Sequence, residues 1–212
     1  QHMSLMRPAL VSQISVMLAV VPEQHTSRDD FTQSLRGWQR AVVQCRAAFG
    51  TLPPLWTVTW VSPPVACAEE EPVWFTTGGI HVYQPGQGSM SLTEWTRDTG
   101  AEGRLSRLSQ GLWLDSLLAW QNSALNDLLS VRRGELPVMK PCVQGMCIVP
   151  VSGIEGNLWQ QHITTVTALP PDTVVTNEPL LLPELLLPAL PRRRGVSRRM
   201  VFWRYAGFLG GI

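Results

Sequence analysis

Residues 10–61 carry a strand–helix–strand pattern that constrains the fold more than any other feature of the chain. Residues 10–21 (LVSQISVMLAVV) are β-branched and almost continuously apolar, which is typical of a strand covered on both faces. Residues 26–30 (TSRDD) are a helix start signal, and apolar residues then recur at helical spacing as far as Gly50. Residues 55–61 (LWTVTWV) predict a second strand. Such a unit builds a parallel sheet with a right-handed crossover, so we expect an α/β fold.

The middle of the chain predicts a hairpin followed by a short helix. Residues 73–77 and 80–84 are typical of two short strands. The pair of glycines between them allows the positive φ angles of a tight hairpin turn. Residues 92–97 predict a short helix behind Ser91, whose hydroxyl is a good N-cap.

Residues 102–133 show the clearest helical period in the sequence. Gly111 is a point where this helix would bend, and Gly134 takes the C-cap position. We interpret the leucines of this helix as one buried stripe, because such stripes pack in a core more often than they bind a partner. The stripe consists of Leu105, Leu108, Leu112, Leu117, Leu125, Leu128 and Leu129.

Beyond this helix the chain predicts one more strand, one more helix and a linker. Residues 138–151 are apolar enough for a strand, with Gly145 as a bulge. Residues 153–169 predict a helix. Prolines interrupt the apolar residues of 170–191, so no long helix fits there. We interpret this segment as a linker between the globular body and a membrane, although its short apolar turns are also compatible with docking on the domain or on the next membrane segment.

The C-terminal residues 191–212 combine a basic cluster with a short apolar and aromatic run. A membrane-spanning helix needs about 20 mostly apolar residues, and residues 201–212 are too few and contain Arg204. We interpret them as the start of a truncated span; the alternative is a basic amphipathic helix packed on its own domain. The residues expected at the membrane surface are Arg192, Arg193, Arg194, Arg198, Arg199, Trp203 and Tyr205.

The predicted organisation therefore changes along the chain from an α/β body to a membrane-proximal end. The first three residues resemble the remnant of a cleaved tag. The parts that follow are an α/β part (4–100), a helical extension packed on it (101–169), a Pro- and Arg-rich linker (170–200) and the start of a membrane helix (201–212).

The charge distribution argues against a nucleic-acid partner. The chain has 17 basic and 16 acidic residues, and six of the arginines lie in residues 191–212, which contain no acid. The remaining chain is acidic, whereas phosphate backbones need a clustered basic face. The three consecutive acids Glu69, Glu70 and Glu71 are either a solvated loop or a docking epitope for a basic partner.

Motifs for nucleotide or metal chemistry are missing from the sequence. A phosphate loop needs the pattern GxxxxGK[ST], but the single lysine, Lys140, is followed by Pro141. The four cysteines, Cys45, Cys67, Cys142 and Cys147, form no CxxC pair and have no histidine at ligand spacing, so we expect buried thiols in a reducing compartment. We predict no catalytic residue, no metal and no cofactor.

Four stretches together resemble the IcmF/TssM/VasK family, the large inner-membrane component of bacterial type VI secretion systems. These are RPALVSQISVMLAVV, WLDSLLAWQNSALNDLL, GIEGNLWQQHI and ALPRRRGVSRRMVFWRYAGFLGGI, which begin at residues 7, 113, 153 and 189. The resemblance implies a partial GTPase-like (P-loop NTPase-like) sheet flanked by helices, ahead of the third membrane helix. The family's guanine-recognition motif would follow residues 55–61, where this chain has Ser62-Pro63-Pro64 instead.

The resemblance implies a scaffold at the cytoplasmic face of the inner membrane. Members of the family dock a TssK-like baseplate protein, a TssL-like inner-membrane partner and, through a periplasmic region, a TssJ-like outer-membrane lipoprotein. The main alternative is a GTP or ATP hydrolase domain whose phosphate-binding motifs lie outside this sequence. A third interpretation is a peripheral lipid-binding domain that uses the C-terminal arginines.

Overall fold

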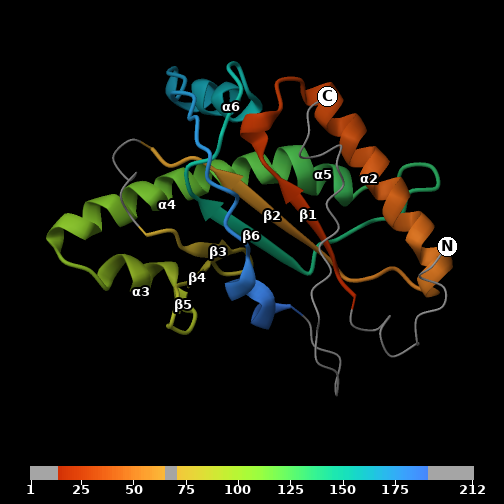
Figure 1. Ribbon diagram of the computed structural model, residues 1–212, viewed down its shortest axis with the longest axis horizontal. Coiled ribbons are helices and arrows are strands. Elements are labelled where there is room, and N and C mark those ends of the chain that lie inside the picture. Colours follow the sequence, from red (N-terminus) through yellow and green to blue (C-terminus); the bar gives the residue numbers. More distant parts are fainter. Residues whose placement is uncertain (1–13, 65–70, 191–212) are drawn as a thin grey trace.

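A computed structural model describes residues 14–64 and 71–190 of the chain. They form an α/β structure around a six-stranded sheet in the order β1-β2-β6-β3-β4-β5 (Figure 1). The strands are β1 (Val16–Val20), β2 (Leu55–Val61), β3 (Trp74–Thr76), β4 (His81–Tyr83), β5 (Met90–Ser91) and β6 (Val143–Ile148). The helices are α2 (Arg28–Phe49), α3 (Leu92–Arg97), α4 (Ala101–Gln121), α5 (Asp127–Leu129) and α6 (Leu158–Thr167).

The predicted strand–helix–strand unit is present, with helix α2 between the parallel strands β1 and β2. Strand β2 has the predicted bounds, and all seven of its residues are buried. The Ser27 hydroxyl accepts a hydrogen bond from the Asp30 amide at 3.3 Å and caps the start of α2. Gly50 ends the helix at φ 73°, a left-handed conformation that suits glycine. Local sequence signals thus fix this half of the sheet.

The expectation of a parallel sheet is wrong for the other half, and the sheet is mixed. Strand β3 runs antiparallel to both β6 and β4, and β4 runs antiparallel to β5. The reversal between β3 and β4 occurs at Gly78 and Gly79, with φ values of 87° and 78°. The hairpin was predicted correctly. Its attachment to β6, which comes much later in the chain, makes the sheet mixed.

Strand β6 lies between β2 and β3, so residues from the expected helical extension form the centre of the sheet. The predicted bulge at Gly145 is absent, because this residue stays in register with Val58 on one side and Thr76 on the other. A Cβ at Gly145 would collide with Cδ1 of Leu186. Glycine therefore serves close packing at this position.

The long helix predicted over residues 102–133 is interrupted, but not at Gly111. Helix α4 continues into a π-helical turn, Asn122–Asn126, and then into α5. Its end at Leu129 precedes Gly134, which lies at φ 58° in a tight turn closed by hydrogen bonds between Arg133 and Leu136. The predicted buried stripe is correct only for its second half, which includes the buried Leu117, Leu125 and Leu129; Leu105, Leu108 and Leu112 are exposed.

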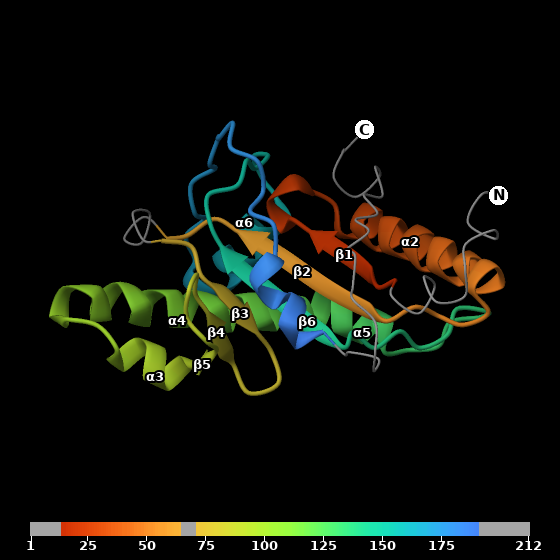
Figure 2. The same cartoon turned by 60° about the horizontal axis from the view of Figure 1, so that its bottom comes forward.

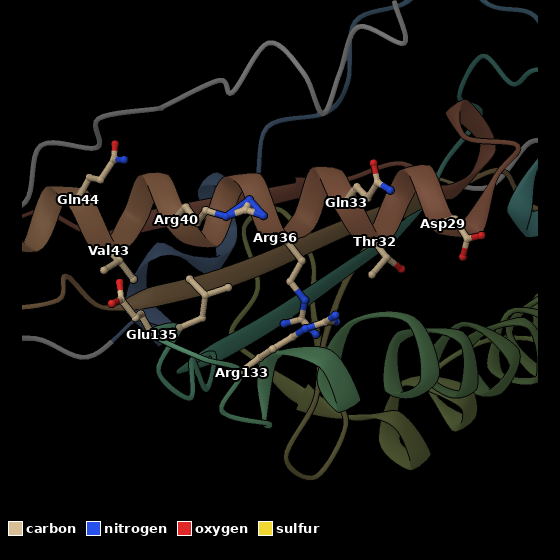
Figure 3. A pocket seen from close by; sticks show the side chains of 10 residues that line it. Asp29, Thr32, Gln33, Arg36, Arg40, Val43, Gln44, Arg133 and Glu135 are labelled. Carbon is tan, nitrogen blue, oxygen red and sulfur yellow. The ribbon is translucent and has the colours of Figure 1, made fainter.

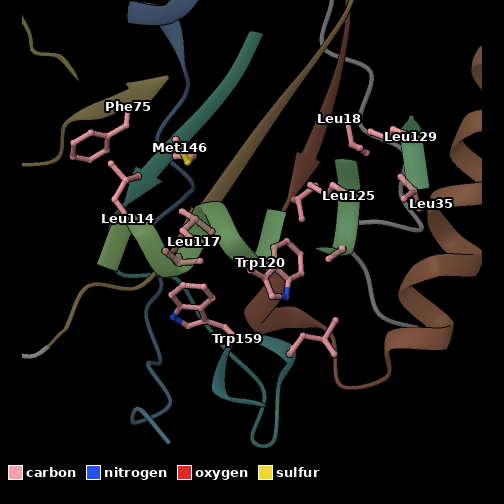
Figure 4. Close-up of a cluster of buried hydrophobic side chains, with 14 of the residues drawn as sticks. Leu18, Leu35, Phe75, Leu114, Leu117, Trp120, Leu125, Leu129, Met146 and Trp159 are labelled. Carbon is pink, nitrogen blue, oxygen red and sulfur yellow. The ribbon is translucent and has the colours of Figure 1, made fainter. Parts of the chain in front are cut away.

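The two faces of the sheet are covered in different ways. Helices α2, α4, α5 and α6 cover one face and share a core that includes Leu35, Leu117, Trp120 and Trp159 (Figure 4). Residues 170–190 lie on the opposite side, where the 3-10 helix Glu184–Ala189 crosses the sheet (Figure 2). Leu186 and Leu190 are buried there against aromatic and apolar residues of the strands: Trp56, Val58, Trp60, Trp74, Val143 and Cys147. Much of the expected linker is thus part of the folded domain.

Several sequence predictions fall outside the described residues. They concern the tag remnant (1–3), the start of the first predicted strand (10–13), the basic cluster and the membrane-helix start (201–212). Within residues 14–64 and 71–190, no helix is long and apolar enough to cross a membrane.

Replacement of Gly145 by alanine should destabilise the domain by about 1–3 kcal/mol, because the added Cβ overpacks the contact with Leu186. Urea denaturation followed by circular dichroism would measure the change. Gly111→Ala is the matched control: it has no atom within 4 Å of the new Cβ, and as a helix-interior change it should stabilise by about 0.5–1 kcal/mol. Equal effects of the two substitutions would contradict the packing role of Gly145. So would strict additivity of Gly145→Ala with Leu186→Ala in a double-mutant cycle.

Candidate functional site

The carboxyl ends of the parallel strands form the edge at which open α/β sheets usually bind ligands. Strand β1 is followed by the 3-10 turn Pro22–Gln24, β2 by Ser62 and β6 by residues 149–151. Residues from all three connections meet at this edge. Their contacts decide whether a ligand has room there.

Glu23 and Ser62 fasten the three strand ends together. The Glu23 side chain is buried, and its Oε2 accepts a hydrogen bond of 2.8 Å from the Ser62 amide. The Ser62 hydroxyl donates to the Val151 carbonyl and accepts from the Val151 amide, both at 3.1 Å. The Glu23 carbonyl also accepts from the Ile154 amide at 2.8 Å. The groups that a ligand would use in an open sheet are thus engaged with one another.

Apolar and amide side chains fill the rest of this edge. Trp113 of α4 donates its indole N–H to the Ser62 carbonyl at 2.9 Å and packs edge-on against Trp159. Asn157, the N-cap of α6, is fully buried, and a Cβ at Gly153 would lie 3.3 Å from both its Nδ2 and the Glu23 Cβ. The edge is therefore a packed junction of the connections that follow the strands.

Burial raises the pKa of the Glu23 carboxyl to about 7, and its hydrogen bonds to Ser62 only partly oppose this rise. A carboxyl with a pKa near neutrality is suited to general acid–base catalysis when it reaches a substrate. In this structure the carboxyl accepts a hydrogen bond from the Ser62 backbone amide within the packed junction. We therefore interpret Glu23 as a structural crosslink.

Glu23 should make stability depend on pH. The native state holds its proton up to about pH 7 and the unfolded chain only up to about 4.5, so its contribution is fully present below 4.5 and is lost as pH rises through 7. The loss is on the order of 3 kcal/mol. Urea denaturation of wild type and Glu23→Gln at several pH values should show the wild type losing stability relative to the variant across this window. A constant difference between them would contradict the raised pKa.

The acidic epitope expected from the sequence is only partly described. Glu71 is exposed, while Glu69 and Glu70 lie outside the described residues. All the residues proposed for the membrane surface, from Arg192 to Tyr205, also lie outside them. Their roles stay predictions from the sequence.

The cysteine expectation is correct in part. Cys147 is buried, and burial raises the pKa of its thiol to about 12, so it is an inert core residue. Cys45 is half-buried and Cys142 is exposed, which contradicts uniform burial. Cys67 lies outside the described residues. In the described part of the chain, no group of three His, Cys, Asp or Glu side chains is arranged to hold a metal ion.

A surface that the sequence interpretation missed lies on the first half of α4. Leu105, Leu108 and Leu112, here called the α4 leucine face, are 72%, 50% and 72% exposed. Leu112 and the fully buried Leu114 are two positions apart, which places them about 200° apart around the helix. The signal was present in this spacing, because the exposed and buried leucines follow two different stripes. The sequence interpretation treated these two stripes as a single buried stripe.

The α4 leucine face is carried by a braced helix at the margin of the molecule. Figure 1 shows the first half of α4 extending past the sheet, with α3 beside it. The Arg107 guanidinium lies over the Trp95 ring at 4.8 Å and donates to the Trp95 and Asp98 carbonyls. Trp95 itself is buried and packs against Phe75 of β3. These contacts hold the helix in place while its outer leucines stay exposed.

Comparison of the chain with protein-family models, with curated proteins and with solved structures finds no match. The resemblance to the IcmF/TssM/VasK family therefore rests on the sequence stretches quoted above. Function is inferred here from that resemblance together with the packed strand edge and the α4 leucine face.

Proposed function

We propose that this chain is a non-enzymatic docking domain of a type VI secretion inner-membrane complex. In this role it lies at the cytoplasmic face of the bacterial inner membrane and binds a TssK-like baseplate protein. The resemblance to the IcmF/TssM/VasK family supplies the identity of the machine and of the partners. The exposed apolar surface of the domain is the reason for assigning a docking role to this chain.

The observation that carries this proposal is the α4 leucine face. Burying a leucine side chain that is otherwise exposed contributes about 1.5–3 kcal/mol, so three such residues are a substantial source of binding energy. Leu105, Leu108 and Leu112 follow the i, i+3, i+7 spacing of helices that insert into a hydrophobic groove of a partner. We therefore assign the main contact with the baseplate protein to this face.

A second contact is proposed at the acidic loop. The chain outside residues 191–212 has 11 basic and 16 acidic residues, which favours a basic partner surface. Glu71 is exposed, and it closes the run Glu69–Glu71. Acidic residues at the rim of an interface act mainly on the rate of association and on specificity. This loop would steer the partner toward the leucine face.

The packed strand edge weighs against the alternative of a nucleotide hydrolase. Glu23, Ser62 and Val151 occupy the positions where a doubly wound sheet receives a ligand, and they bond to one another. Binding a nucleotide there would require breaking these hydrogen bonds and displacing Trp113. A docking role leaves them intact.

The remaining partners follow from the resemblance alone. A TssL-like protein would contact the domain near the inner membrane, and a TssJ-like lipoprotein would be reached through a periplasmic region outside this sequence. The expected place of the arginines between Arg192 and Arg199 beside anionic headgroups fits this orientation.

Replacing Leu105 and Leu112 by serine should weaken capture of the TssK-like protein at least about tenfold, because two exposed leucines lose their burial on binding. Pull-down followed by surface plasmon resonance of the full chain would measure this. The matched control is Leu169→Ser with Val175→Ser, which are 72% and 86% exposed outside the face. Equal affinity of both double variants would move the contact elsewhere on the domain, and no capture by wild type would refute the docking role.

Alanine replacement of Glu69, Glu70 and Glu71 tests the acidic contact separately. We expect a slower association rate with a smaller change in dissociation, and an effect that shrinks as salt is raised. Rate constants at low and high salt would show this. A change confined to the dissociation rate would contradict the steering role.

A further inference from the structure

A groove of about 770 Å³ runs between α2 and the turn at residues 133–136, away from both surfaces described above (Figure 3). Its walls contain three arginines, Arg36, Arg40 and Arg133, and two acids, Asp29 and Glu135. In Figure 3 the Arg36 and Arg133 side chains point toward one another across the groove. The function proposed above makes no use of this cluster.

Arg36 is the most deeply placed of the three arginines, with 8% of its surface exposed. Its Nη1 donates to the Gln39 side-chain oxygen at 2.9 Å and to the Leu128 carbonyl at 3.2 Å. Its Nε is buried and has no hydrogen-bond partner among the described residues. A buried charged donor without a hydrogen-bond partner is destabilising, so packing within the domain alone does not account for the position of Arg36.

The other two arginines are held near Arg36 by the backbone. Arg40 lies one turn further along α2, on the same side of the helix. Arg133 begins the tight turn in which its amide and carbonyl both bond to Leu136, at 3.1 and 3.0 Å. Burial lowers the pKa of Arg36, and the positive charges of Arg133 and then Arg40 lower it further. Arg133 and Arg40 therefore both place positive charge close to the Arg36 guanidinium.

Helix capping explains only part of this arrangement. The Leu128 carbonyl is at the end of α5, where carbonyls lack helical partners and a cation is favoured. One arginine satisfies that need, and a helix C-terminus supplies only about half a negative charge. Arg40 and Arg133 add two more positive charges. A bound anion between the three guanidinium groups would offset the positive charge that Arg36 meets from Arg133 and Arg40.

We propose that this groove binds a compact dianion with the chemistry of a phosphate group, held between Arg36, Arg40 and Arg133. Guanidinium groups bind phosphate oxygens through paired N–H donors, and a cluster of arginines is a common solution for a phosphoryl group. Asp29 and Glu135 flank the cationic centre, so an extended acidic peptide would meet repulsion that a compact anion avoids. The phosphate group is either free inorganic phosphate or a phosphomonoester on a larger molecule.

The test is calorimetric titration of the full chain with sodium phosphate, against sodium chloride at equal ionic strength, and in parallel with O-phosphoserine. We expect saturable binding of one phosphate per chain that chloride does not reproduce. Tighter binding of inorganic phosphate would identify the free ion as the ligand. Tighter or equal binding of O-phosphoserine would indicate a phosphomonoester.

Variants separate this site from general attraction to basic residues. Arg40 and Arg133 are exposed, so the variants Arg40→Gln and Arg133→Gln should still fold. Each variant should weaken phosphate binding at least about tenfold. Arg132→Gln removes a neighbouring exposed charge that does not line the groove, and it should leave affinity unchanged within about twofold. Absence of saturable binding, or equal losses in all three variants, would overturn the proposal.

Discussion

The burial of strand β2 on both faces is the constraint on which the rest of this structure depends. All seven of its residues are buried: Leu55 and Val61 pack toward the helices, while Trp56, Val58 and Trp60 face the other way. Two tryptophans on a sheet face are a large apolar area that must be covered. Leu186 and Leu190 provide that cover, and the Trp60 indole donates to the Leu181 carbonyl at 3.0 Å. The proline-rich segment is thus part of the core.

The same close packing also limits which surfaces of the domain can receive a ligand or a partner. At the carboxyl edge, Glu23 and Ser62 join the connections that follow β1, β2 and β6, so the usual ligand position of an α/β sheet is filled by the protein itself. Two surfaces away from this edge are open to a partner or a ligand. The α4 leucine face offers apolar area, and the groove beside α2 offers concentrated positive charge. The first carries the proposed docking role, and the second carries the proposed phosphate site.

Sequence reasoning succeeded where the signal is local. The bounds of β2 and α3, the start signal of α2 at residues 26–30 and its stop at Gly50 all follow from residues a few positions apart. It failed where partners are distant: the antiparallel pairing of β3 with β6 joins residues about 70 positions apart, and no local pattern sets its direction. Of the docking and membrane-surface residues predicted from the sequence, only Glu71 lies within the described part of the chain, and it is exposed. The α4 leucine face was missed because its leucines and the buried ones were interpreted as one stripe, although their spacing places them on different sides of the helix.

The sequence by itself determined the elements: a strand–helix–strand start, a glycine hairpin and capped helices, because caps, turns and hydrophobic periods act through neighbouring residues. Tertiary structure alone decided which of the two leucine stripes is buried, that residues 170–190 close the second face, and that Arg36 meets Arg133 from another part of the chain. Those outcomes depend on which surfaces the sheet brings together. Burial and charge proximity are properties of the assembled fold, and single segments do not carry them.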